Sequence, residues 1–253
     1  MERARELDVA LAEGRRLMEV AATTDLDARV PSCPDWSIGE LVGHVAWVHR
    51  WVTTVLTTPE GERPSRKTVP PSPEGPEVLT WYAEGLGTLD ATLRATDPDR
   101  EVVVFGGTGP ARFWSRRMAH ENALHRWDIE VAAGLEPAPI AGDVALDGIE
   151  EALEVMMPPR FALDEFGPNG ETLHLHTTDL DTIDGVGEGD GEWIITFGAE
   201  GVEVTHGHAK GDAAVRGTAS DLALFVYSRL GVDRLQAFGD DTVATRFQDA
   251  AHF

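Results

Sequence analysis

The sequence is poor in cysteine, in lysine and in positive charge. Cys33 is the single cysteine among 253 residues, so no disulfide can form within the chain, and a reducing compartment is expected. Lys67 and Lys210 are the only lysines, and 21 basic residues stand against 44 acidic ones, which gives a formal net charge of -23. Because this charge repels phosphate backbones and anionic membrane surfaces, we expect neither nucleic acid nor a membrane as a partner.

Long hydrophobic runs are also absent. No segment has the length and apolar character of a membrane span, and no signal peptide is recognisable. These features predict a cytoplasmic protein. A chain of 253 residues is long enough for a sizeable core and for two domains of ordinary size.

The first half of the chain has helical periodicity. The four apolar patterns run over Leu7–Ala21, Ile38–Val55, Leu79–Leu93 and Trp114–Ala132. Ser37 and Glu40 have the spacing of a capping box, which predicts that the second helix begins near Ile38, and Pro110 is predicted to open the fourth helix. Residues 58–76 hold six prolines and are expected to cross the surface. Four such helices predict an antiparallel four-helix bundle.

The pattern changes after residue 137. Helices are expected over about Asp143–Met157 and Ser220–Leu230, and the runs between them alternate between apolar and polar residues. These short runs begin at Leu173, Trp193, Val202 and Ala213. They predict strands of a mostly antiparallel sheet, so the chain is expected to be α+β, with a helical domain over 1–137 and a smaller α+β domain over 138–253.

Two of the predicted helices carry residues that can bind a metal. Glu121 and His125 lie one helical turn apart, so their side chains converge, and His44 lies on the apolar stripe of the second helix. A carboxylate buried in such a stripe is costly unless it is paired or coordinates a cation. Two histidines and one carboxylate leave a coordination position open, which is typical of catalytic zinc, with nickel or iron as alternatives. The competing interpretation is an ion pair between Glu121 and a nearby arginine, with both histidines as ordinary core residues.

Other polar residues are candidates for supporting roles. Asp128 follows His125 by three residues and could accept the second ring N–H of that histidine, although pairing with a neighbouring arginine is the more ordinary role. His49 and His120 are predicted to lie at the rim or on the surface.

Two further pairs of histidines lie on predicted strands. His174 and His176, like His206 and His208, are two residues apart, which places each pair on one strand face. Two such pairs on adjacent strands could bind a metal. Exposed strand histidines are common, however, and no carboxylate in the sequence is evidently positioned beside them.

Three segments together carry a resemblance to a known family. They are PDWSIGELVGHV at 34–45, HENALHRWD at 120–128 and GTASDLALFVYSRL at 217–230. With them, nearly the whole chain resembles the mycothiol-dependent maleylpyruvate isomerase family. The resemblance implies a DinB-like metal-binding bundle followed by a domain similar to sterol carrier protein 2 (SCP2-like), with His44, Glu121 and His125 as zinc ligands. Arg229 matches the family pattern only loosely, and a substrate-binding role is expected for it on that basis.

The resemblance also implies a function. It points to a zinc-dependent isomerase or S-transferase that uses mycothiol as cosubstrate and acts on a small electrophilic, anionic substrate such as maleylpyruvate. Zinc would lower the pKa of the bound thiol until the nucleophilic thiolate dominates. Two alternatives remain: a metal-dependent hydrolase, and a non-catalytic protein that binds a small ligand.

Overall fold

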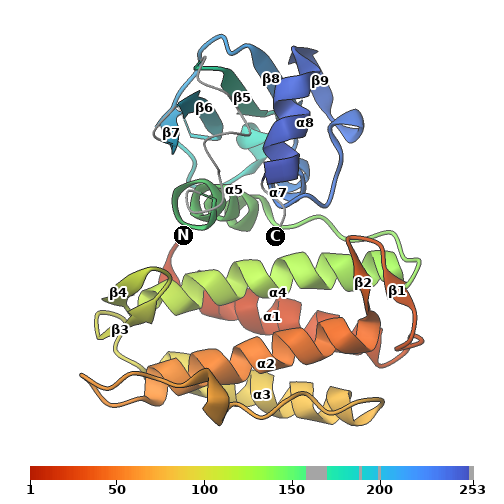
Figure 1. The fold of residues 1–253 in the computed structure, drawn as a ribbon, viewed down its shortest axis with the longest axis vertical. Helices are drawn as coiled ribbons and strands as arrows, with labels where there is room; N and C mark the ends of the chain where they lie inside the picture. The colour runs from red at the N-terminus through yellow and green to blue at the C-terminus, as the bar shows by residue number, and fades with distance from the viewer. Residues whose placement is uncertain (158–169, 188–189, 199–200, 251–253) are drawn as a thin grey trace. The chain divides into compact units, whose positions relative to one another are not determined.

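The chain contains two compact units, residues 1–138 and 139–253. The computed structural model describes residues 1–157, 170–187, 190–198 and 201–250. The first unit is mainly helical and the second contains a five-stranded sheet with helices (Figure 1), which confirms the predicted α+β class. No helix in the described ranges is long and apolar enough to cross a membrane.

Four long helices build the first unit. They are α1 (Arg3–Ala21), α2 (Ile38–Thr57), α3 (Glu77–Ala95) and α4 (Arg112–Ala132). Two short antiparallel pairs lie in the connections: β1 (Arg29–Val30) with β2 (Cys33–Ser37), and β3 (Glu101–Val104) with β4 (Gly107–Pro110). Pro110 therefore ends a strand, and the prediction that it opens the fourth helix was wrong. The glycines before it form the turn of a hairpin, in which Gly106 has a φ of 77°.

The directions of the helices differ from the predicted antiparallel bundle. α1 and α4 are parallel neighbours, because their contacts advance in the same direction along both helices. These contacts are Ala10 with Asn122, Glu13 with Arg126, and Arg16 with Glu130. α2 and α3 are also parallel, since Gly43 lies beside Val78 and Ala46 beside Gly85. The prediction that all neighbouring helices are antiparallel was therefore wrong.

The proline-rich segment 58–76 makes the parallel pairing of α2 and α3 possible. α2 has 20 residues, and a helix of that length is about 30 Å long. An extended chain as long as this segment reaches roughly 60 Å, so it can return along the whole bundle before α3 begins. The return runs along α2, where the Arg66 guanidinium lies 5.4 Å from the centre of the Trp51 ring and Ser72 lies beside Gly43.

A capping box starts α2, as predicted. Ser37 Oγ accepts a hydrogen bond from the Glu40 backbone N–H at 3.2 Å, and Glu40 Oε2 accepts one from the Ser37 N–H at 2.7 Å. We expect Ser37→Ala to lower the free energy of unfolding by about 1 kcal/mol, because the Glu40 N–H loses its partner. Urea denaturation measures this, with Ser37→Thr as the control that keeps the cap. Equal stabilities of the two variants would contradict the role of this hydrogen bond.

The second unit is built on one sheet. Its elements are α5 (Gly142–Glu151), which continues into a π-helical turn (Ala152–Met156), then β5 (Thr172–Thr177), β6 (Glu192–Gly198), β7 (Gly201–His206), β8 (Ala213–Gly217), α7 (Ala219–Val226), β9 (Gln236–Gly239) and α8 (Asp241–Ala250). The strand order is β7-β6-β5-β8-β9, and only β5 and β8 pair in parallel. The predicted mostly antiparallel sheet is confirmed, whereas β9 and α8 were not predicted.

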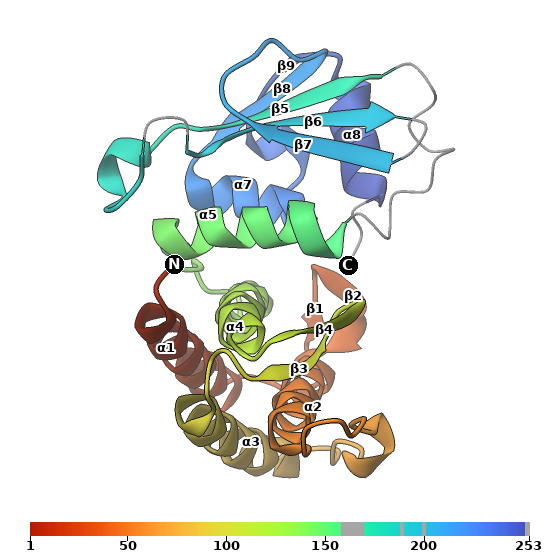
Figure 2. The same ribbon diagram turned by 90° about the vertical axis from the view of Figure 1, so that its left-hand side faces the viewer.

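The two faces of this sheet differ in character. Leu175, Trp193 and Val215 belong to one face and are fully buried. Trp193 Nε1 donates to Glu150 Oε1 of α5 at 2.7 Å, so this face is turned toward the helices, and Figure 2 shows α5 and α7 beneath it. Because strand residues alternate, His174 and its second neighbour His176 belong to the opposite face. That face carries polar side chains.

Candidate metal centre

The three predicted metal ligands come together in the first unit. Nε2 of His44 on α2 and Nε2 of His125 on α4 each lie 3.5 Å from Oε1 of Glu121. One ligand atom from each residue lies within 4.8 Å of the others. His44 contacts His125 and His49 contacts Asn122, so α2 and α4 are antiparallel, and His44 lies opposite the Glu121 and His125 pair.

The site is buried on one side and open on the other. Glu121 and His125 are both only 7% exposed, whereas the side chain of His44 is 38% exposed. His44 also lines a cleft of about 880 Å³, together with Trp36, Trp47 and Arg29. A small molecule in this cleft can therefore approach the site from the His44 side.

Glu121 is held as a charged carboxylate. Its Oε2 accepts a hydrogen bond from Arg117, one turn earlier on α4. Burial alone would raise the pKa of Glu121, but the positive charge of Arg117 and the contacts with His125 and His44 hold it well below its usual value. Sequence analysis offered an ion pair between Glu121 and an arginine as the alternative to a metal site, and this ion pair is present. It engages Oε2 and leaves Oε1 directed at both imidazoles, so the two interpretations are compatible.

Asp128 orients His125. Its Oδ2 lies 2.9 Å from Nδ1 of His125, and its Oδ1 accepts a hydrogen bond from Ser32 Oγ at 2.5 Å. Burial alone would lower the pKa of His125, but the hydrogen bonds with Asp128 and Glu121 raise it. The carboxylate favours hydrogen on Nδ1, so Nε2, which faces Glu121, is the nitrogen that would bind a metal after losing its own hydrogen.

The donor set fits a divalent transition metal. Ligands bound at about 2.0–2.1 Å in a tetrahedron are about 3.3 Å apart, close to the observed 3.5 Å separations from Glu121 Oε1 to the two Nε2 atoms. Two imidazoles and one carboxylate suit zinc, nickel or iron, and they leave a position for a further ligand.

His49 and His120 do not lie at the rim or on the surface, as the sequence analysis predicted. His49 is fully buried and His120 is 2% exposed. His49 Nε2 donates to Asn122 Oδ1 at 2.9 Å, and Asn122 Nδ2 donates to the carbonyl of Ala10 at 2.7 Å. Burial lowers the pKa of His49 to about 4, so this histidine is neutral and links α2 to α4 inside the bundle.

The histidines of the second unit are also arranged differently from the prediction. His208 lies beyond the end of β7 and joins His174 and His176, while His206 lies with its Nδ1 3.5 Å from Glu150 Oε1. The prediction that His206 and His208 share one face of a strand was therefore wrong, because the strand ends at His206.

Arg229 lies just after α7 in the second unit. Its guanidinium donates to the carbonyl of Tyr227 at 2.7 Å. A substrate-binding role for Arg229 stays a prediction.

Comparison with known families accounts for most of the chain. The profile of the mycothiol maleylpyruvate isomerase N-terminal domain matches residues 7–130, and that of the C-terminal domain matches residues 143–246. The chain belongs to the mycothiol maleylpyruvate isomerase family. Crystal structures of the mycothiol-dependent maleylpyruvate isomerase and of its histidine-to-alanine mutant have the same fold, with TM-scores of 0.63 and 0.66. Each is 15% identical to this family member, covering 94% of this chain and 93% of the other. No curated protein matches the sequence.

Proposed function

We propose that this protein is a zinc- and mycothiol-dependent isomerase acting on a small anionic electrophile such as maleylpyruvate. One observation carries the proposal: His44, Glu121 and His125 converge beside an open cleft in a chain of this family. The family's name supports the choice of thiol and of substrate class. The exposed edge of the site supports a role for the open position in binding a reactant.

The chain's own residues have separable tasks in this proposal. His44, Glu121 and His125 would hold the metal, which when bound lowers the pKa of a thiol ligand. Asp128 keeps Nε2 of His125 directed inward, and Arg117 keeps Glu121 ionised. Both supports are buried, so the ligand set is held in place before a reactant arrives.

The cleft offers contacts for an anionic substrate. Arg29 lines it, and its side chain is largely exposed, with the guanidinium 3.9 Å from Glu40 and 3.1 Å from the carbonyl oxygen of Asp35. Trp36 and Trp47 add apolar surface. A guanidinium matches a carboxylate in geometry and charge, so Arg29 is the residue we assign to substrate binding in this unit.

The direct test is turnover of maleylpyruvate by the zinc-loaded protein with and without mycothiol, followed by proton NMR. We expect conversion to the trans isomer only when mycothiol is present, with the thiol recovered unchanged, because the adduct must eliminate it. Stoichiometric loss of thiol to a thioether would instead show a transferase. Turnover without thiol would show a hydrolase, and retention of the ligand without turnover would show a binding protein.

A further inference from the structure

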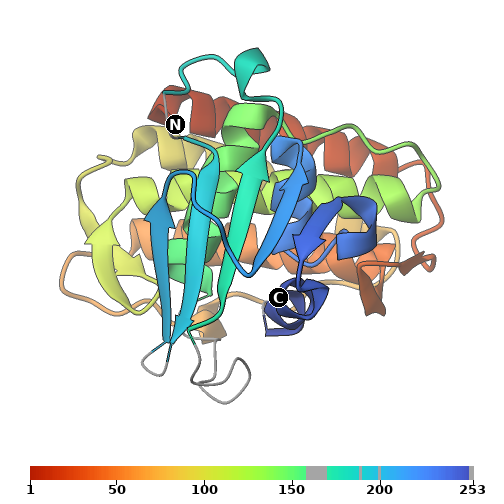
Figure 3. The same ribbon diagram turned by 90° about the horizontal axis from the view of Figure 1, so that it is seen from above.

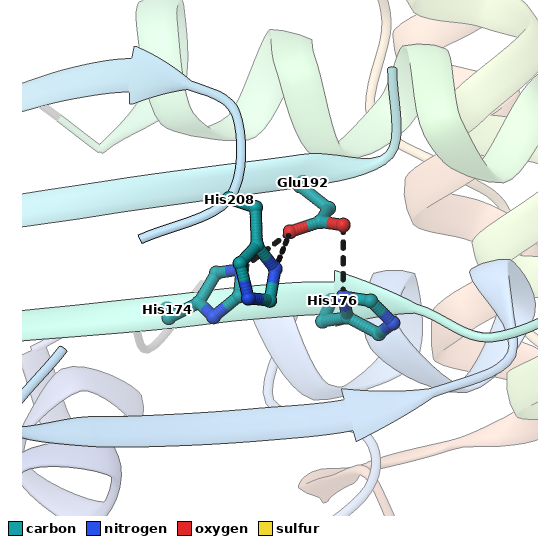
Figure 4. Close-up of side chains that lie close together, drawn as sticks. All are labelled: His174, His176, Glu192 and His208. Atoms are coloured by element: carbon teal, nitrogen blue, oxygen red, sulfur yellow. Dashed lines mark hydrogen bonds and ion pairs between the residues drawn. The ribbon is translucent and has the colours of Figure 1, made fainter. Parts of the chain in front are cut away.

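Three histidines and a glutamate meet on the polar face of the sheet in the second unit. β5 supplies His174 and His176, and β6 supplies Glu192, which lies beside His176 in the strand register. The fourth residue, His208, lies in the segment 207–212, which must cross β6 and β5 because β7 and β8 are not neighbours. Figure 3 shows this crossing, and Figure 4 shows the side chains that it brings together.

We propose that these four residues bind a divalent transition-metal ion, separate from the candidate centre in the bundle. Glu192 Oε2 lies 2.9 Å from His174 Nε2 and 2.7 Å from His208 Nδ1, and its Oε1 lies 3.0 Å from His176 Nδ1. The four ligand atoms lie within 4.8 Å of one another. The imidazole centroids are 5.1–6.0 Å apart and the rings are nearly perpendicular, so three ring nitrogens converge without ring stacking.

The environment of His176 favours a metal site over a cluster held together by hydrogen bonds alone. Its Nδ1 is buried and lies near Glu192 Oε1. The angles of this contact do not suit a hydrogen bond, and no other described residue supplies one to this nitrogen. A metal ion would give this nitrogen a partner. Three nitrogen donors with one oxygen favour zinc, nickel or copper over calcium or magnesium, which prefer oxygen ligands.

The site differs in accessibility and type from the one in the bundle. His174 is almost fully buried, whereas the side chain of His208 is 74% exposed, so an ion can enter from solvent on the His208 side. Four protein ligands complete a tetrahedron and leave no open position, which is typical of structural zinc. The ion would link the segment 207–212 to strands β5 and β6 through their shared ligands.

In the observed arrangement, Arg216 disfavours metal binding by His176. Its Nη2 lies 3.2 Å from His176 Nε2, and a guanidinium can only donate, so Nε2 accepts and the ring hydrogen is on Nδ1. Coordination through Nδ1 requires the other tautomer. Arg216→Gln supplies an amide oxygen that can accept from Nε2–H, and it also removes a positive charge.

The test uses full-length protein with His44→Ala, which disables the bundle centre. Zinc binding is measured by competition with a chromophoric chelator, and cobalt absorption reports the coordination geometry. We expect one zinc per chain and a tetrahedral cobalt spectrum, a loss of at least about tenfold in affinity in His208→Ala, and tighter binding in Arg216→Gln.

His206→Ala is the matched control, because His206 is an exposed histidine nearby that lies outside the cluster. It is expected to keep the zinc. His208 is largely exposed, so its replacement should not disturb folding, which circular dichroism verifies. Absence of zinc binding in the His44→Ala protein, or equal zinc affinity in the His208→Ala and His206→Ala proteins, would overturn the proposal.

Discussion

His125→Ala is expected to abolish metal binding at the proposed bundle centre and to reduce the proposed isomerase activity by at least about a thousandfold. A metal ion that acts as a Lewis acid contributes several kcal/mol of transition-state stabilisation, and each 1.4 kcal/mol corresponds to about a factor of ten in rate. Alanine removes one of the three proposed ligands and also leaves Asp128, which is fully buried, without its histidine partner. Glu121 and His44 alone make a weak site.

The measurement is metal content by mass spectrometry beside turnover in the presence of mycothiol. A His208→Ala background removes the second proposed site, so that the bundle metal is counted alone. In that background we expect about one zinc per chain, and almost none after His125→Ala. His206→Ala is the control for the loss of a histidine elsewhere. If His125→Ala kept both its zinc and its turnover, the assigned ligand set would be rejected.

The convergence of His44, Glu121 and His125 could be predicted because most of it is local. Glu121 and His125 are one turn apart on a helix, so their proximity needs no knowledge of the fold. His44 needed the further assumption that its helix packs against theirs, and the resemblance to a family supplied it. The capping box at Ser37 is local in the same sense, and its prediction is confirmed.

Features that depend on distant pairing were missed. Glu192 is beside His176 only because β5 and β6 pair in one register, and His208 arrives only because the strand order forces segment 207–212 across the sheet. The place of His49 in α2 was also predicted wrongly, since this histidine was expected at the rim or on the surface and is fully buried. The hydrogen bond of His49 with Asn122 stabilises a buried position that an apolar pattern does not reveal.

Arg126→Met is expected to lower the free energy of unfolding by about 3–5 kcal/mol, the cost of removing one partner from a buried ion pair. Arg126 is 2% exposed and donates to Glu13 Oε2 at 2.7 Å and to Glu130 Oε2 at 2.9 Å, which joins α4 to the parallel helix α1. Burial alone would raise the pKa of Glu130, but hydrogen bonds from Arg16 and Arg126, then from the Ala138 N–H, lower it. Without Arg126 that carboxylate keeps only part of this stabilisation.

Urea denaturation of three variants separates the buried charge from simple loss of packing. Arg126→Met with Glu130→Leu removes both charges of the pair, so it should recover much of the stability that Arg126→Met loses. Arg94→Ala breaks exposed pairs with Asp8 and Asp90 and should cost less than about 1 kcal/mol. If Arg126→Met cost no more than Arg94→Ala, the network would not be what fixes α1 against α4. In that case the apolar contacts between these helices would have to hold Glu121 and His125 in position.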